Sequence, residues 1–512
     1  MDIILVIDIG TSSMRGGLYD EYGKIKKIIQ IHYSPEYFAT NRVEQDPIYW
    51  ENALIQITSE AVQWLKTQGL PLEAISITSQ RTSIIPVDRS GSPLHNAIMW
   101  QDKRTYNICE ELKLYDAFVY NRSGAKINPV FTAPKIKWLK ENEPNIYKSA
   151  HKILVIPDYA IFLMTGKFVT DYTYGSRTSL MNIHELEWDN ELLELFKVDR
   201  EKLCELIPQG SIAGYTTEMF MKRTGLPSGT PVISAGGDQQ CAALGAGAIG
   251  NGSFQITTGT GSYIIASSNT LQLDSQMRTI CSVSAVKSKY MLESSILTTS
   301  TICNWFCDNF YANSKGDSAF ERMLEDALVS PVGSNNLITF PHFQGRGSPD
   351  WNSLASGIFF NVSLGTTRGD FARSILEAIA LEISENLDIM NRIIGTITSI
   401  STAGGLTKSS LFNQIQADIY NQPISLPNNR ETTSLGAWVT ASLEMGMYDS
   451  YQKALNQAEK GTRNMLYYPI SENVVIYDKQ KLRRLALYNN LEQNGIYQLL
   501  REDGLDKNHQ FS

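Results

Sequence analysis

The sequence predicts an α/β fold built from two similar domains, and three observations support this prediction. Residues Ile3–Ile9 form an apolar run typical of a buried strand, and it ends in a turn rich in Gly and Ser. A second strand–turn–strand unit of the same kind lies near residue 259, which indicates an internal duplication. The chain has 512 residues, a length that corresponds to two large domains or about three average ones.

The first half of the chain shows strands and a helix in α/β order. A turn cluster at residues 20–23 separates the strand before it from a second strand at residues 24–32, so an early hairpin is expected. Residues 49–65 carry apolar side chains at helical spacing. Residues 74–78 then form a short strand that ends in polar residues. Strand, hairpin, helix and strand in this order predict an α/β layer structure.

The second half follows the same logic. Residues 230–235 predict a strand that ends in a Gly pair and an Asp, and residues 252–257 predict a strand that ends in a second Gly-rich turn. Residues 262–266 continue as the return strand of that turn. A further strand is predicted at residues 397–403. A Gly pair then forms a turn, and a helix follows at residues 411–420.

The domain boundary is expected near residue 245. Residues 242–252 are rich in Gly and Ala, which would let a helix pack closely. We therefore predict an N-terminal domain at 1–245, a C-terminal domain at 246–490 and a polar tail at 491–512. The last residues, about 495–512, are expected to be loosely held.

Composition and charge exclude several classes of protein. Hydrophobic residues make up 42% of the chain and charged residues 19%, which excludes a disordered chain. The net charge of −8 argues against nucleic-acid binding, which needs a basic face. No apolar stretch approaches 18 residues and no signal-peptide pattern opens the chain, so we expect no membrane contact. None of the six cysteines forms a metal-site pattern, and buried free thiols in the cytoplasm are expected.

Two Gly-rich turns are candidate phosphate loops. Asp8 lies at the end of the first strand, where it is available to a metal ion, and the turn after it offers backbone N–H groups and hydroxyls. The second turn repeats this chemistry in the same strand context. The alternative for either turn alone is an ordinary β-turn. The candidate phosphate-binding residues are Thr11, Ser12 and Ser13 in the first turn and Thr258, Gly259, Thr260 and Gly261 in the second.

A third motif places an acid between a strand and a helix. Asp238 follows Gly236 and Gly237 and precedes a helix that begins near Gln239. As a general base, Asp238 would accept the proton of a substrate hydroxyl. The alternative is an N-cap, and both roles are compatible. A fourth motif, the Gly pair at 404–405, would let the backbone pass close to a flat ring such as adenine.

A fifth motif combines polar groups with an aromatic ring, a mixture that suits a sugar. Such a site needs donors and acceptors for hydroxyls and a flat ring for the carbon face. The alternative is a surface salt-bridge cluster. The motif consists of residues 79–82 and 100–104, and its candidate substrate-binding residues are Gln80, Arg81, Thr82, Trp100 and Asp102.

Together these motifs resemble the FGGY carbohydrate kinases, which include glycerol kinases and xylulokinases. The resemblance runs in order through about residues 2–490. The matching segments are residues 7–15, 44–50, 97–104, 135–144, 157–166 with Asp171, 225–245, 257–262, 340–351, 403–406 and 431–437.

The resemblance implies two ribonuclease H-like domains of the actin-like ATPase type that flank a cleft holding ATP and Mg²⁺. It implies Asp238 as the catalytic base, and Asp8 with Asp238 as the metal-associated acids. It places Arg15 with the first phosphate loop, Gln239 with the substrate, and Gly404 and Gly405 at the adenosine. The partner it implies is a small sugar or polyol, and a homodimer is one expected assembly.

The departures from the family concern the substrate. Thr82 stands where glycerol kinases carry a substrate-binding Glu, and Val130 where they carry a Tyr. Losing such contacts should change the substrate, because sites built to bond hydroxyls discriminate strongly. Residues 135–144 are more similar to xylulokinases. Arg346 replaces a family acid, and Asn361 a family Gly.

We therefore expect phosphorylation of a pentulose-type or related substrate by ATP. Glycerol kinase is the first alternative. The alternative of another class is a nucleotide-gated binding or regulatory protein of the same fold, since a fold alone does not determine function. Arg81, Trp100 and Asp102 favour the kinase, because a small-molecule pocket needs convergent polar groups.

Overall fold

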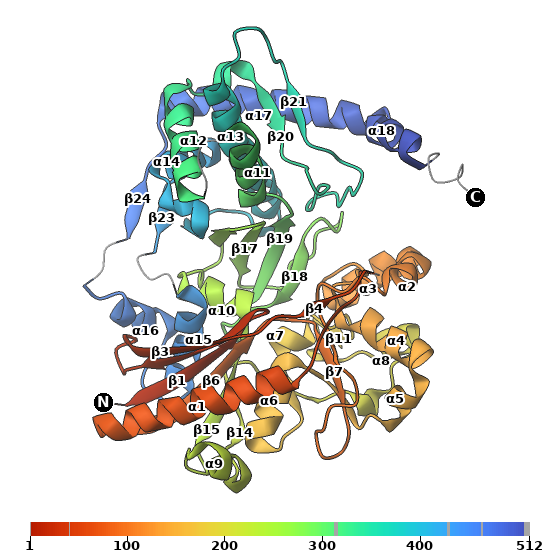
Figure 1. The fold of residues 1–512 in the computed structure, drawn as a ribbon, viewed down its shortest axis with the longest axis vertical. Coiled ribbons are helices and arrows are strands. Elements are labelled where there is room, and N and C mark those ends of the chain that lie inside the picture. Colours follow the sequence, from red (N-terminus) through yellow and green to blue (C-terminus); the bar gives the residue numbers. More distant parts are fainter. Residues whose placement is uncertain (1, 40, 312–315, 428–430, 462–463, 506–512) are drawn as a thin grey trace. The chain divides into compact units, whose positions relative to one another are not determined.

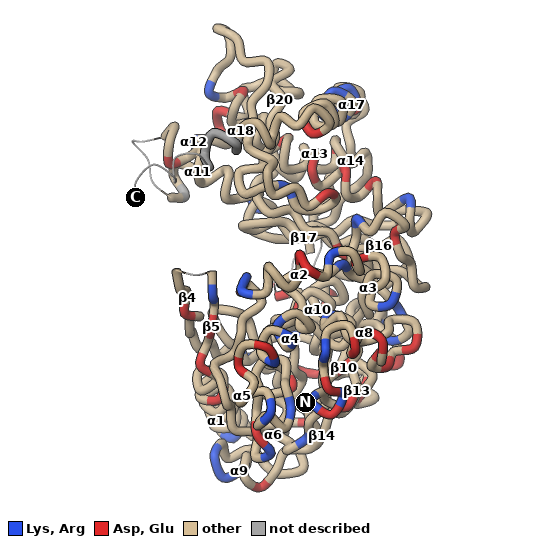
Figure 2. The backbone as a smooth tube through the Cα atoms, turned by 90° about the vertical axis from the view of Figure 1, so that its right-hand side faces the viewer, with Lys and Arg blue, Asp and Glu red and all other residues tan. Residues whose placement is uncertain are grey.

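The computed structural model in Figure 1 describes residues 2–39, 41–311, 316–427, 431–461 and 464–505. The chain divides into two compact units, each of which is built from three segments of the sequence. Unit 1 comprises Met1–Gly250, Ser267–Leu292 and Asn429–Thr462. Unit 2 comprises Asn251–Ala266, Glu293–Asn428 and Arg463–Ser512. Figure 2 shows acidic and basic residues interspersed along both units.

Unit 1 is built on a six-stranded sheet with the order β14-β15-β6-β1-β2-β3. β1 pairs antiparallel with β2 and parallel with β6, which in turn pairs parallel with β15. The carboxyl ends of β1, β6 and β15 therefore meet at one edge of the sheet, where α/β folds place their ligands. The strands are β1 (Ile3–Ile9), β2 (Ser13–Tyr19), β3 (Ile25–His32), β6 (Leu72–Ser79), β14 (Ser211–Tyr215) and β15 (Pro231–Gly237).

The structure confirms the predicted early hairpin and the strand after it as parts of this sheet. It also confirms the predicted helix between them. The strand predicted from the first apolar run has the observed bounds of β1, Ile3–Ile9. Its side chains alternate between two cores. Leu5 and Ile7 pack in one cluster with Ile57 of α1 (Ile48–Gln68), and Ile4 and Val6 pack in another with Trp438 of α15 (Thr432–Glu444). A strand buried on both faces needs apolar residues at every position, which is why the run is continuous.

The Gly- and Ala-rich segment packs closely against a helix, as predicted. A Cβ on Gly245, at the end of α10 (Asp238–Gly245), would lie 1.9 Å from the carbonyl oxygen of Thr432. A Cβ on Gly436 would lie 1.9 Å from the carbonyl oxygen of Cys241. The two helices α10 and α15 therefore touch backbone to backbone, and both contact points require glycine.

Unit 1 contains further strands and helices beside this sheet's strands, α1, α10 and α15. A five-stranded sheet has the order β4-β5-β8-β7-β9, and β10 pairs with β13 and β11 with β12. The strands are β4 (Glu36–Tyr37), β5 (Val43–Gln45), β7 (Ile84–Val87), β8 (Ala97–Ile98), β9 (Lys152–Val155), β10 (Val169–Asp171), β11 (Met181–Asn182), β12 (Glu187–Trp188), β13 (Glu205–Ile207) and β18 (Ile280–Val283). The helices are α2 (Tyr106–Leu112), α3 (Asp116–Ser123), α4 (Thr132–Asn142), α5 (Pro144–Ser149), α6 (Ile156–Thr165), α7 (Tyr172–Gly175), α8 (Asn190–Phe196), α9 (Glu218–Thr224) and α16 (Tyr451–Ala458), with 3-10 turns at Lys113–Tyr115 and Arg200–Lys202.

Unit 2 repeats the strand arrangement of unit 1. β16 pairs antiparallel with β17 and parallel with β22, as β1 does with β2 and β6. This likeness agrees with the predicted duplication. From β19, whose second half belongs to unit 2, the sheet has the order β19-β17-β16-β22-β23-β24. The strands are β16 (Ser253–Thr258), β17 (Ser262–Ser268), β19 (Tyr290–Ile296), β22 (Ser399–Ala403), β23 (Ile424–Leu426) and β24 (Met465–Tyr467), with β20 (Ile338–Phe340) and β21 (Ile358–Phe360) as a separate pair.

Long helices complete unit 2. They are α11 (Ser300–Phe310), α12 (Asp317–Val329), α13 (Arg368–Ile394), α14 (Ser410–Tyr420), α17 (Ser471–Gln493) and α18 (Ile496–Leu505), with 3-10 turns at Ser334–Asn336 and Gly405–Lys408. The expectation of a loosely held end is wrong for its first part. Tyr497 of α18 is fully buried beside Phe340 and Tyr488, because the helix presents an aromatic ring to a small core. Residues 506–512 lie outside the described residues.

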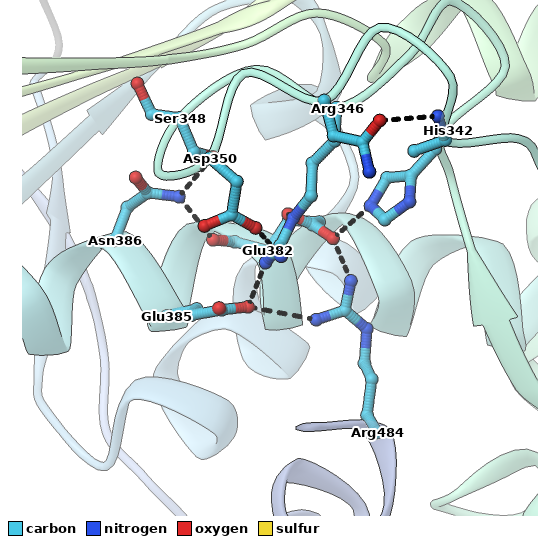
Figure 3. Close-up of polar contacts among 10 residues, drawn as sticks. His342, Arg346, Ser348, Asp350, Glu382, Glu385, Asn386 and Arg484 are labelled. Carbon is cyan, nitrogen blue, oxygen red and sulfur yellow. Dashed lines mark hydrogen bonds and ion pairs between the residues drawn. The ribbon is translucent and has the colours of Figure 1, made fainter. Parts of the chain in front are cut away.

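A buried charge network stands where the sequence departs from the family acid. Figure 3 shows Arg346 among acids of α13: its Nη2 lies 2.5 Å from Glu385 Oε2, and its Nε lies 3.5 Å from Glu382 Oε2. Arg484 of α17 pairs with the same two glutamates. His342 Nε2 lies 2.6 Å from Glu382 Oε1. The basic replacement is therefore compensated by acids on the helix beneath it.

The second departure also has a local explanation. Asn361 has a φ of +69°, in the left-handed region where the family carries Gly. Asn tolerates this region better than most residues with a side chain. Its Nδ2 donates to the carbonyl oxygen of Asn336 at 3.2 Å, which ties the turn down.

Candidate active site

The edge of the unit 1 sheet brings the predicted acids together. Asp8 precedes the end of β1, and Asp238 follows the end of β15. Burial, and next the negative charge of Asp238, raise the pKa of Asp8 to about 7, while Arg15 acts in the opposite direction. Arg15 faces Asp8 across the β1–β2 pair. A buried acid whose pKa is raised further by a neighbouring carboxylate is typical of a site that receives a cation.

Sequence reasoning did not place Glu431 in this group. Its Oε2 lies 2.9 Å from Nη1 of Arg15, and its charge also raises the pKa of Asp8. Glu431 precedes α15, more than 400 positions along the chain from Arg15. The only available signal was its place at the start of the motif at 431–437.

The first phosphate loop is joined to the sugar motif by one hydrogen bond. Trp100 Nε1 donates to Thr11 Oγ1 at 3.0 Å, and the Gly10 amide donates to the carbonyl oxygen of Ser13 at 2.9 Å. Gln30 Nε2 donates to Ser13 Oγ at 3.1 Å. Ser12 is exposed at the tip of the loop. The indole thus orients the Thr11 hydroxyl, and the two predicted sites form one region of unit 1.

Asp238 is the first residue of α10, and the residue at the N-cap is Gly237. The N-cap alternative is therefore wrong for Asp238. Asp238 Oδ1 accepts from the Gln239 amide at 2.7 Å and lies 3.4 Å from Arg81 Nε. The side chain is 28% exposed, so a substrate hydroxyl can reach it. This partial exposure beside a cation suits a general base.

Several glutamine side chains near these groups have buried atoms without a partner in the described structure. The atoms are Gln80 Nε2, Gln101 Oε1, Gln239 Oε1 and Gln240 Nε2. Gln240 Oε1 accepts from Arg81 Nη1 at 3.3 Å, and Gln80 Oε1 accepts from Ser83 Oγ at 3.1 Å. Buried polar atoms are normally bonded, so unpartnered amides point to a ligand or ordered water. Gln101 and Gln240 stand inside two of the predicted motifs, but the sequence analysis assigned no role to either.

Thr82 has an unusual conformation. Its φ is +72°, which is strained for a β-branched residue, and its side chain is buried. Its hydroxyl donates to the carbonyl oxygen of Arg81 at 2.6 Å. In this arrangement the hydroxyl is directed to the backbone, so a direct substrate contact by Thr82 stays a prediction.

Asp102 lies in a salt-bridge cluster, although not in the surface cluster that the alternative describes. It is 1% exposed, and its carboxylate accepts from the Val43 amide at 2.6 Å and from three donors of Arg104 at 2.8–2.9 Å. Arg104 Nη2 also contacts Glu44 Oε1 at 2.6 Å. The cluster is buried rather than on the surface. The sugar contact of Asp102 stays a prediction, and its visible role is to hold the segment that carries Trp100.

The edge of the unit 2 sheet brings the second phosphate loop to the Gly pair. Thr257 of β16 is in register with Ala403 of β22, so the segments after both strands start side by side. Gly404 has a φ of +105°, and a Cβ there would lie 2.2 Å from the carbonyl oxygen of Thr258. Only glycine allows this approach.

Hydroxyl groups missed by the sequence analysis hold this loop. Thr299 Oγ1 and Ser300 Oγ donate to the carbonyl oxygen of Gly259 at 2.7 and 2.5 Å, and Thr301 Oγ1 donates to that of Thr260 at 2.9 Å. Because these carbonyl oxygens accept hydrogen bonds from the hydroxyls, they are turned away from a phosphate bound at the loop. The Thr258 hydroxyl is buried without a partner in the described structure. No motif flagged residues 299–301, because their role depends on a contact across 40 positions.

Asp8 and Asp238 of unit 1 are the candidate ligands of the predicted Mg²⁺. Within the described residues, no group of three or more His, Cys, Asp or Glu side chains forms a ready metal site. Magnesium in phosphoryl-transfer sites is bound by one or two carboxylates together with substrate phosphates and water. The paired Asp8 and Asp238 fit this requirement. All six cysteines are free and buried, as predicted.

In the described part of the chain, no helix combines the length and the apolar character that a membrane span requires.

Comparisons with known proteins agree with this geometry. The N-terminal domain of the FGGY family of carbohydrate kinases matches residues 3–245, and its C-terminal domain matches residues 254–445. A glycerol kinase of Saccharolobus islandicus is 35% identical over 467 residues, covering 88% of this chain and 90% of that protein. A glycerol kinase of Thermococcus onnurineus is 34% identical, covering 89% and 92%.

Solved structures show the same fold. A ligand-bound xylulose kinase from Lactobacillus acidophilus has a TM-score of 0.89 at 25% identity, covering 96% of this chain and 99% of that one. Plasmodium falciparum glycerol kinase with ADP has a TM-score of 0.87 at 26% identity, covering 96% and 98%. The predicted two-domain actin-like ATPase fold is thereby confirmed. With both family domains matched in order, the chain belongs to the FGGY family of carbohydrate kinases.

Proposed function

We propose that this protein transfers the γ-phosphoryl group of ATP to a hydroxyl of a small polyol, with glycerol as the first candidate. The observation that carries the proposal is Asp238, a partly exposed carboxylate held beside Arg81 and within electrostatic reach of Asp8. Curated relatives at 34–35% identity over most of the chain are glycerol kinases. These relatives favour a polyol over the pentulose expected from the sequence.

In the proposed reaction, Asp238 accepts the proton of the substrate hydroxyl. The hydroxyl oxygen then forms a bond to the γ-phosphorus, the bond from that phosphorus to the β–γ bridging oxygen breaks, and ADP leaves with the electron pair. Arg81 keeps the carboxylate oriented through its contacts with Asp238 and Gln240. When bound at Asp8 and Asp238, Mg²⁺ would neutralise phosphate charge.

The phosphate loops have separate tasks in this proposal. Thr11, Ser12, Ser13 and Arg15 of unit 1 bind phosphate through hydroxyl, amide and guanidinium groups. Thr258–Gly261 of unit 2 binds phosphate through amides, with the Thr260 hydroxyl at the γ-phosphoryl group. Gly404 and Gly405 lie against the adenosine. Such contacts use no excess of positive charge, in agreement with a net charge of −8.

A pentulose is the second candidate substrate. Thr82 and Val130 stand where glycerol kinases carry larger polar side chains, and the Thr82 hydroxyl donates to the carbonyl oxygen of Arg81. The site therefore has fewer hydrogen bonds for a three-carbon ligand than its relatives, and a longer ligand could use the unpartnered glutamine amides. Xylulose kinase is also among the similar structures.

ADP release in the presence of glycerol, xylulose and a panel of polyols, ketoses and aldoses tests the proposal. We expect stimulation by at least one small polyol, and Asp238→Asn should remove most turnover while ATP binding persists. Asp478→Asn, on an exposed face of α17, is the matched control and should leave turnover unchanged. Absence of stimulation by every compound, or near-normal turnover of Asp238→Asn, would contradict the proposal. Sedimentation measures the oligomeric state and tests the predicted homodimer separately.

A further inference from the structure

The strand that delivers Asp238 is irregular just before it ends. β15 follows β6 in parallel register up to Ser234, and the register then shifts before Gly236 pairs with Thr78. Gly236 has a φ of +117°, which is open to glycine alone without strain. A bulge of this kind re-aims the residues after it, and here they lead directly into α10. The direction of Asp238 therefore depends on how firmly the bulge is held.

A buried carboxylate from another strand holds both sides of this bulge. Asp171, at the end of β10, is fully buried. Its Oδ2 accepts from Ser234 Oγ at 2.5 Å, on the near side of the bulge. Its Oδ1 accepts from Thr173 Oγ1 at 2.5 Å, and Thr173 Oγ1 in turn accepts from the Gly237 amide at 2.9 Å, on the far side.

Helix capping alone does not explain this arrangement. Asp171 caps the four-residue helix α7 through the Thr173 amide at 2.7 Å, and a cap needs no more than that. The bonds to Ser234 and, through the Thr173 hydroxyl, to Gly237 reach across more than 60 positions of sequence. They end next to the residue that must be aligned with the substrate.

Neighbouring groups hold the same point from other directions. Tyr174 Oη and Thr78 Oγ1 both donate to the carbonyl oxygen of Gly236, at 2.9 and 2.8 Å. Burial raises the pKa of Asp171 to about 6, so the carboxylate is ionised under slightly alkaline assay conditions and can accept all of its donors.

We propose that Asp171 and Thr173 are positioning residues for Asp238, and that the Thr173 hydroxyl is the link between them. Its catalytic consequence rests on the proposed function. Groups that orient a reacting side chain without touching the substrate can matter strongly, because a misplacement of about 1 Å can lower the rate roughly 10²-fold.

Replacing Thr173 by Val tests the link. The change keeps the shape of the side chain and removes the hydroxyl, which leaves the Gly237 amide without its acceptor. Thr224→Val is the matched control. Thr224 Oγ1 also donates to a carbonyl, that of Phe220 at 2.8 Å, and accepts from an amide, that of Leu226 at 3.2 Å, but at the end of α9. Thr173→Ser retains the hydroxyl and should rescue. If Thr173→Val does not fold, Thr173→Ala removes the same group with less crowding.

Two readouts separate positioning from general stability. Amide hydrogen exchange should be at least about tenfold faster for the segment at 236–240 in Thr173→Val, because an exchange-protecting bond is lost. Thr224→Val should leave exchange of that segment unchanged. With the substrate found in the ADP-release screen, kcat of Thr173→Val should fall about 10- to 100-fold, while KM for ATP changes less than about twofold.

Each outcome decides a different claim. Unchanged exchange at 236–240 in Thr173→Val, or an equal loss of kcat in Thr224→Val, would overturn the positioning role. If the wild-type protein phosphorylates no compound of the screen, the proposed function fails, and the exchange comparison still decides whether Thr173 holds the bulge.

Discussion

Arg81 Nε lies 3.4 Å from Asp238 Oδ1, with the guanidinium group also bonded to Gln240. The Arg81 side chain is only 9% exposed, so its planar group is held between the end of β6 and the first turn of α10. A Cβ on Gly237 would lie 2.8 Å from Arg81 Cδ, which shows how closely the backbone is packed against it. The orientation of Asp238, the proposed base, therefore depends on the planar guanidinium group of Arg81. A cation of another shape could not make both contacts.

Arg81→Lys tests this dependence. Lysine retains the charge but has no planar fork, so it cannot hold Asp238 and Gln240 together. We expect kcat/KM for the substrate to fall by a factor of about 10 to 100, with KM for ATP little changed. Arg223→Lys, at an exposed pair with Glu51, is the control and should leave both constants within about twofold. Equal effects of the two substitutions would argue against a special role for Arg81.

Gly404→Ala should weaken nucleotide binding by at least about tenfold. The new Cβ would lie 2.2 Å from the carbonyl oxygen of Thr258 at a φ of +105°, so the second phosphate loop must shift. Titration with ATP, followed calorimetrically, measures the effect. Gly405→Ala meets no atom within 4 Å and serves as the control for folding, with an unchanged thermal midpoint expected. Normal ATP affinity in Gly404→Ala would contradict the proposed adenosine and phosphate contacts.

Arg346→Ala should destabilise unit 2. Arg346 is 3% exposed and pairs with Asp350, Glu382 and Glu385, and its guanidinium carbon lies 3.9 Å from the centre of the Tyr488 ring. Removing one partner of a buried ion pair costs about 3–5 kcal/mol, because the remaining charge stays buried. Denaturant unfolding measures the loss. The neighbouring exposed Arg483→Ala should cost less than about 0.5 kcal/mol, and similar losses for both would contradict the network's importance.

Acid should weaken the same network through His342. Burial lowers the pKa of His342 below its usual value near 6.5, although Glu382 opposes this shift and Arg484 and Arg346 add to it. The unfolded chain therefore binds the proton first, and the free energy of unfolding falls as pH decreases below about 6.5.

The His342→Gln variant isolates this contribution. Its free energy of unfolding should vary less steeply between pH 5 and 7, by up to about 1.4 kcal/mol per pH unit. Denaturant unfolding of both proteins across that range provides the comparison, because all other titrating groups are shared. Parallel pH profiles would show that His342 does not titrate in the window.

Local sequence pattern was enough for elements whose cause is local. The apolar run of β1, the turn at residues 20–23 and the helical spacing of α1 each depend on neighbours along the chain, and all were predicted. The Gly pair at 404–405 was also recognisable, because glycine marks close approach of backbones. The capping alternative for Asp238 failed because the bulge in β15 puts Gly237 at the N-cap.

Long-range contacts were beyond the reach of sequence pattern. The hydroxyls of residues 299–301 on the second loop have an ordinary sequence context. Glu431 and Asp171 belong to matching motifs, but nothing in those motifs indicated that Glu431 pairs with Arg15 or that Asp171 holds the bulge. From the sequence, Arg346 was only the replacement of a family acid. The structure shows that glutamates of α13 pair with it and that Arg484 of α17 pairs with the same glutamates. Each role depends on a strand register or a helix position that cannot be predicted from the neighbouring residues in the sequence.

By itself, the sequence determined the α/β order, the two Gly-rich loops and the acids Asp8 and Asp238. Strand ends and turns depend on the types of the neighbouring residues, so they can be predicted locally. The tertiary structure decided which polar groups surround them: Arg81 and Gln240 at Asp238, Glu431 at Arg15, and Thr173 behind Gly237. The physical reason is that hydrogen bonds and ion pairs act over a few ångströms of space, whatever number of residues separates the partners.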